Sequence, residues 1–73
     1  METFYTVIEN QRNADGTFGL LHYHYTDRDQ AYSKYFTICA TAAISDIPYY
    51  AAYLIDSGVG VIEQREWDRR EVE

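Results

Sequence analysis

Two stretches near the N-terminus combine alternating side chains with turn residues between them, and this pattern predicts a β-hairpin. Thr3 to Gln11 is rich in aromatic and β-branched residues, and a second such stretch runs from Thr17 to about Tyr25. The segment between them, Asn13-Ala14-Asp15-Gly16-Thr17, has Asn, Asp and Gly where a type I turn closed by a left-handed glycine requires them. We therefore expect Asn13 to pair with Thr17.

That turn fixes the register, so that Tyr5 is expected opposite Tyr25. One face of the hairpin then carries Tyr5, Val7, Leu21, Tyr23 and Tyr25. The other face carries Phe4, Thr6, Ile8, Leu20, His22 and His24. The first set is the better core, although a slip of one residue would exchange the faces of one strand.

Helical spacing replaces the alternation after residue 25. Thr26 or Asp27 can cap the free N–H groups of a helix, and acidic residues in its first turn suit the helix dipole. The helix is expected to continue through Ala43 and to end before Pro48. Its main apolar stripe is Ala31, Tyr35, Ile38 and Ala42, with a second flank of Tyr32, Phe36, Cys39 and Ala43.

A second hairpin is predicted in the C-terminal third of the chain. Its strands are Tyr49 to Ile55 and Val59 to about Arg65, joined at Asp56-Ser57-Gly58 by a loop of two or three residues. The order ββαββ predicts an α+β domain over 1–66, with one helix packed on one face of a four-stranded antiparallel sheet. Residues 67–73 are expected to form a charged tail from which only Trp67 docks.

Composition adds an excess of tyrosine to this picture. The chain has eight Tyr, three Phe and one Trp. Its length of 73 residues is enough for one domain only. Tyr49, Tyr53 and Ile55 lie on one side of their strand and Tyr50 and Leu54 on the other, whereas a single helix can cover only one side. Either the second side is a solvated face that tyrosine tolerates, or it meets a second copy or another protein.

The charge and the cysteine content exclude several classes of protein. A net charge of −6 argues against direct nucleic-acid binding. It suits a partner with a basic groove, or it serves only to keep the domain in solution. The single Cys39 excludes an internal disulfide, which favours a cytoplasmic location. No signal-peptide pattern and no apolar run of membrane-spanning length occurs, so no membrane partner is expected.

The candidate chemical groups are few. His22 and His24 lie on one side of a strand, roughly 7 Å apart, but a stable metal site needs a third ligand, and Thr6 and Ile8 opposite them are not strong ligands. Cys39 has no neighbouring group that would lower the pKa of its thiol. We therefore expect no catalytic residue, no metal and no cofactor.

Several segments resemble a group of small uncharacterised proteins encoded by phages and mobile elements of gut bacteria. The resemblance extends over most of the chain, and the residues that match best are Asn13 to Thr17, Asp27 to Tyr35, and Ala40 to Ser45 with Pro48. These motifs are caps, turns and core alanines, so the resemblance implies fold and origin and transfers no functional residue. It also implies a role as an inhibitor, because small acidic phage proteins often inhibit host defence nucleases, including CRISPR effectors.

The sequence therefore predicts a non-catalytic protein-binding module, an anti-CRISPR-like inhibitor of a host nucleic-acid-binding complex in the bacterial cytoplasm. The alternative is a structural phage protein that acts as a homo-oligomer, and a homodimer is expected in either case. Nine residues are predicted to contact the partner: Tyr49, Tyr50, Tyr53, His22, His24, Trp67, Glu63, Glu66 and Asp68.

Overall fold

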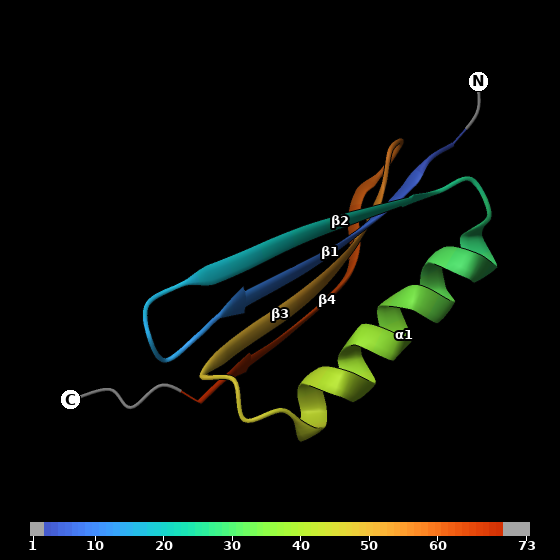
Figure 1. Ribbon diagram of the computed structural model, residues 1–73. Helices are drawn as coiled ribbons and strands as arrows, with labels where there is room; N and C mark the ends of the chain where they lie inside the picture. The colour runs from blue at the N-terminus through green and yellow to red at the C-terminus, as the bar shows by residue number, and fades with distance from the viewer. Residues whose placement is uncertain (1–2, 70–73) are drawn as a thin grey trace.

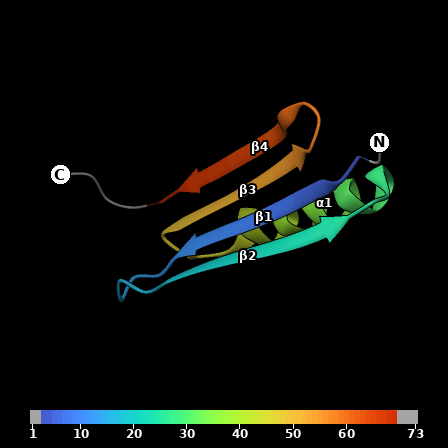
Figure 2. The ribbon, with the colours of Figure 1, turned by 90° about the horizontal axis from the view of Figure 1, so that it is seen from above.

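The two hairpins join side by side into one antiparallel sheet, and the helix that connects them lies across one of its faces (Figure 1). The computed structural model describes residues 3–69. The elements are β1 (Tyr5–Arg12), β2 (Phe18–Tyr25), α1 (Arg28–Ile44), β3 (Tyr49–Asp56) and β4 (Gly60–Asp68). The strand order is β2-β1-β3-β4, with β1 and β3 at the centre (Figure 2). The predicted α+β fold is confirmed.

The first hairpin has the predicted turn and register. The Gly16 amide donates to the Asn13 carbonyl at 3.1 Å, the Asn13 amide donates to the Thr17 carbonyl at 2.8 Å, and Gly16 has a positive φ of 91°. Asp15 Oδ1 holds the turn by accepting from the Thr17 amide at 3.0 Å. Tyr5 lies opposite Tyr25, as the turn required. A residue with a Cβ is strained at such a φ, which is why the turn needs Gly16.

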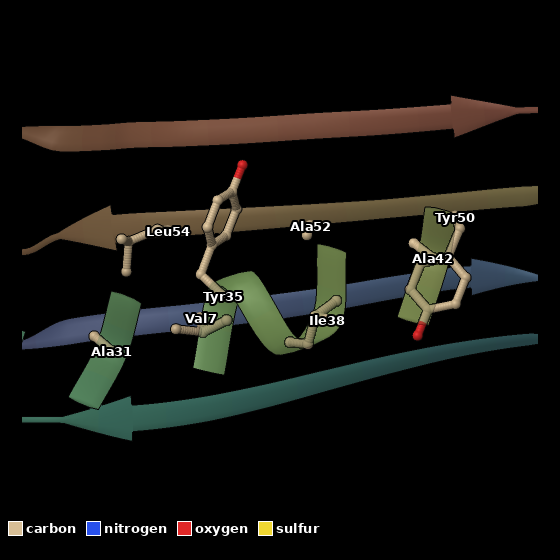
Figure 3. Close-up of a cluster of buried hydrophobic side chains, with 8 residues drawn as sticks. All are labelled: Val7, Ala31, Tyr35, Ile38, Ala42, Tyr50, Ala52 and Leu54. Carbon is tan, nitrogen blue, oxygen red and sulfur yellow. The ribbon is translucent and has the colours of Figure 1, made fainter. Parts of the chain in front are cut away.

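The helix begins and buries its main stripe as predicted. Asp27 is the N-cap, and its side chain accepts a hydrogen bond from the Asp29 amide at 2.9 Å. The main stripe of α1 faces the sheet, where it packs against side chains of β1 and β3 (Figure 3). The eight residues of this core cluster are Val7, Ala31, Tyr35, Ile38, Ala42, Tyr50, Ala52 and Leu54.

The second flank of the helix was predicted only in part. Tyr32 and Cys39 pack against the core, whereas Phe36 and Ala43 are exposed. The helix meets the sheet along a single stripe, so a side chain on the far edge of the flank has no strand beneath it. Phe36 instead makes ring contacts within the helix, with its centroid 5.8 Å from Tyr32 and 5.7 Å from Tyr35.

The last strand is longer than the sequence indicated. Asp56 pairs with Gly60, so the loop contains Ser57, Gly58 and Val59, and β4 then continues past the predicted end at Arg65. Trp67 lies within this strand and packs against the core. Residues 67–69 of the predicted tail therefore have defined positions, and 70–73 lie outside the described residues.

Arg69 joins the end of β4 to the end of the helix. Its amide donates to the Pro48 carbonyl at 2.6 Å, and its Nη2 donates to the Ala42 carbonyl at 2.7 Å. The last turn of α1 has no basic residue of its own, so this guanidinium supplies the positive charge that the carbonyl end of a helix attracts. Within residues 3–69, no helix is long and apolar enough to cross a membrane.

Candidate protein-binding surface

The face of the sheet turned away from α1, here called the open face, has none of the described helices or strands packed on it (Figure 1). Side chains alternate along a strand, and Val7 of β1 points toward the helix. The open face therefore carries the even-numbered residues of β1 and their cross-strand partners. Its members are Thr6, Ile8, Asn10, Arg12, Phe18, Leu20, His22, His24, Tyr49, Ala51, Tyr53, Ile55, Val61, Gln64, Glu66 and Asp68. Aromatic and aliphatic side chains from all four strands thus meet on one uncovered surface.

The structure brings six of the nine predicted contact residues together on this face, namely Tyr49, Tyr53, His22, His24, Glu66 and Asp68. The other three lie on the face that α1 covers. Tyr50 is only 1% exposed, and Trp67 pairs with it. Glu63 pairs with Leu54, a core residue. Tyr50, Trp67 and Glu63 therefore cannot belong to a contact surface on the open face.

Tyr50 instead belongs to a buried polar cluster that was not predicted from the sequence. Its hydroxyl donates to the Glu9 carboxylate and accepts from Gln11 Nε2, the latter at 3.1 Å. Burial, reinforced by the neighbouring Glu9, raises the pKa of Tyr50 to about 12. The predicted register already placed Glu9 on the same side as Val7, so a carboxylate on the core face was the signal available in the sequence.

Local hydrogen bonds hold several side chains of the open face. The Tyr49 hydroxyl donates to Glu66 Oε2 at 2.5 Å, and this bond, with burial second, raises the pKa of Tyr49. Thr6 Oγ1 and His24 Nδ1 lie 3.2 Å apart across β1 and β2. The Arg12 guanidinium lies 5.9 Å from the centre of the Phe18 ring. Side chains fixed in this way lose less conformational entropy when a partner binds.

The structure places the candidate reactive groups of the sequence as follows. Thr6 and Ile8 lie opposite His24 and His22, as the predicted register required. Among the described residues, no group of three or more His, Cys, Asp or Glu side chains is placed to hold a metal ion. Burial raises the pKa of the Cys39 thiol, which makes the nucleophilic thiolate scarcer.

Many of the acidic side chains have partners within the chain. Asp15, Asp27 and Asp56 accept hydrogen bonds from backbone amides in turns and at the helix cap. Glu9 and Glu66 accept from tyrosine hydroxyls. These five carboxylates are dispersed over both faces and both ends of the sheet, and they do not form the row of charges that a phosphate backbone presents.

No family model, no curated protein and no solved structure matches this chain.

The raised tyrosine pKa values predict a loss of stability in base. Near pH 10 and above, tyrosines of the unfolded chain release their protons, whereas buried Tyr50 keeps its proton up to a pH of about 12. Burial likewise raises the pKa of Tyr35. The folded state then binds more protons than the unfolded state, so the free energy of unfolding should fall as the pH rises from about 10 to 12. Urea titrations at a series of pH values measure this slope.

The matched control for this pH dependence removes the two buried phenols. The Tyr35→Phe and Tyr50→Phe variants should each show a shallower decline in base than the original chain, because each lacks one group with a raised pKa. A stability that is flat across this range, or a decline that neither variant reduces, would contradict the assignment.

Proposed function

We propose that this chain is a non-catalytic protein-binding module that contacts its partner through the open face. The observation that supports the proposal is a sheet with one face closed by α1 and the other face left with large apolar and aromatic side chains, including Leu20, Tyr53 and Ile55. Tyrosine and other aromatic residues are enriched where protein interfaces carry most of their binding energy.

The partner we propose is a nucleic-acid-binding defence complex of a bacterial host, which the module inhibits in the cytoplasm on behalf of a phage or prophage. Two features of the sequence suggest this choice: the resemblance of its turn, cap and alanine motifs to those of phage proteins, and the net charge of −6. A negative domain is attracted to a basic nucleic-acid channel, which speeds association. Because many of its acids serve turns, caps and tyrosines, we propose that the module occludes the channel with its apolar face and does not imitate a phosphate backbone.

A pull-down with matched variants tests this function. The tagged chain, Tyr53→Glu on the open face and Ala40→Glu on the exposed side of α1 are each incubated with lysate of a gut bacterium that carries a defence nuclease. We expect the original chain and Ala40→Glu to recover a nucleic-acid-binding complex, and Tyr53→Glu to bind it at least about 30-fold more weakly, as loss of an aromatic interface anchor does. Circular dichroism checks that both variants remain folded.

The recovered complex is then purified and tested by gel shift on its own nucleic acid. Inhibition by the original chain and by Ala40→Glu, but not by Tyr53→Glu, is the expected result. Recovery of no nucleic-acid-binding complex, or equal recovery by all three proteins, would contradict the proposed function.

A further inference from the structure

Among the strands of residues 3–69, β2 is the last one on its side of the sheet, so no described strand pairs with its outer edge (Figure 2). The hydrogen bond from the Asn13 amide to the Thr17 carbonyl shows which of its backbone groups are free. Hydrogen-bonded pairs alternate along an antiparallel ladder, so the odd-numbered residues of β2 bond to β1. The N–H and C=O groups of Phe18, Leu20, His22 and His24 therefore point outward from the sheet.

The two edges of the sheet differ in the features that protect an edge from pairing. β2 carries no Asp, Glu, Lys, Arg or Pro among its eight residues, and its ladder with β1 has no bulge. The other edge, β4, has a register shift opposite Leu54 and Ile55 and carries acidic side chains at Glu66 and Asp68 on its outward-facing residues. Charges and bulges discourage strand addition, and β2 has neither.

We propose that two copies of this chain pair through the outer edges of β2, antiparallel about a two-fold axis, and so form one continuous sheet. Only one register of the two β2 strands lets all the outward N–H and C=O groups form hydrogen bonds. Leu20 then pairs with the partner's His22, and Phe18 pairs with the partner's His24. Leu21 lies on the axis opposite the partner's Leu21, in a pair without backbone hydrogen bonds.

A second copy fits this edge for reasons of charge and burial. The chain carries a net charge of −6, so two copies approach most easily through a segment without formal charge, which β2 is. Leu20 and Leu21 are 49% and 48% exposed on opposite faces of β2, and the paired strand would cover part of both. Since the two-fold axis is perpendicular to the sheet, the open faces of the two copies become one surface. The pairing uses the edge of β2 and leaves the open faces uncovered, so it does not depend on the proposed function.

Light scattering during size-exclusion chromatography measures the mass of the full chain in solution. We expect twice the monomer mass of 8.6 kDa at high micromolar concentration. Leu21→Lys places two like charges opposite each other on the axis and should weaken dimerisation at least about tenfold. The matched control, Val61→Lys, changes an exposed residue of β4 and should leave the dimer unchanged. A monomeric original chain, or a dimer insensitive to Leu21→Lys, would overturn the proposal.

Cysteine cross-linking tests the register in a Cys39→Ala background. Antiparallel residues in a pair without backbone hydrogen bonds lie about 4.5 Å apart at Cα, within disulfide range. Under mild oxidation, Leu21→Cys should give a covalent dimer on a non-reducing gel, whereas Leu20→Cys and Val61→Cys should remain largely monomeric. Stronger cross-linking through Val61→Cys, or through neither β2 position in a chain that is dimeric by mass, would show that another surface is used.

Discussion

Replacing Leu54 with alanine is expected to lower the free energy of unfolding by about 2–5 kcal/mol, the range for removing a large aliphatic side chain from a packed core. Leu54 is fully buried at the centre of the sheet, opposite Val7 and beneath the helix. A domain of this length has a total stability on the order of 5 kcal/mol, so a loss at the upper end of this range should leave a large fraction of the molecules unfolded at room temperature. Urea denaturation followed by circular dichroism, at one fixed protein concentration, measures the change.

The control for this prediction is an aliphatic residue that is almost fully exposed. Ile44, the last residue of α1, is 89% exposed, so Ile44→Ala should change the free energy of unfolding by less than about 0.5 kcal/mol. If Leu54→Ala were as mild as Ile44→Ala, the core would not lie between α1 and the β1–β3 pair.

The second large effect is expected from removing one hydroxyl group. Tyr50→Phe takes away the donor to Glu9, a residue that is only 8% exposed, and leaves a buried charge with an unmet hydrogen bond. Such a loss costs about 1–3 kcal/mol, more than the bond itself contributes when it is present. The urea midpoint should fall accordingly, and Glu9→Gln in the Tyr50→Phe background should recover part of the loss because it removes the charge.

Tyr35→Phe is the matched comparison, because it removes a hydroxyl of the same kind from a residue equally buried. The Tyr35 hydroxyl meets hydrogen-bond geometry with no group among the described residues, although the thiol of Cys39, a weak partner, is near enough to raise its pKa. Its removal should therefore be neutral or slightly stabilising. A larger loss for Tyr35→Phe than for Tyr50→Phe would contradict the polar cluster.

The features that sequence reasoning predicted well depend on local chemistry. Asn13, Asp15 and Gly16 can form few turns other than the one observed, and that turn set the pairing of the whole first hairpin. The helix stripe of Ala31, Tyr35, Ile38 and Ala42 follows from spacing alone, and these are the residues that α1 buries.

The features that could not be predicted from the sequence depend on contacts between segments that are far apart along the chain. The pairing of β1 with β3 places Glu9 beside Ala52 and Gln11 beside Tyr50, and no local signal connects these residues. Alternation along the strand separated Tyr50 from Tyr49 and Tyr53, but it did not show which side the helix covers, so the predicted contact set mixed both faces. The end of β4 was missed because its charged residues resemble a tail, although Trp67 and Arg69 attach it to the rest of the fold.

Photo-crosslinking in host cells tests most directly the claim that the open face binds a protein. A photoreactive phenylalanine analogue replaces Tyr53 on the open face or, as the control, Ala40 on the exposed side of α1. The proposed surface predicts an adduct with a second protein from position 53 and little or none from position 40. Adducts that form equally from both positions, or from neither, would contradict it.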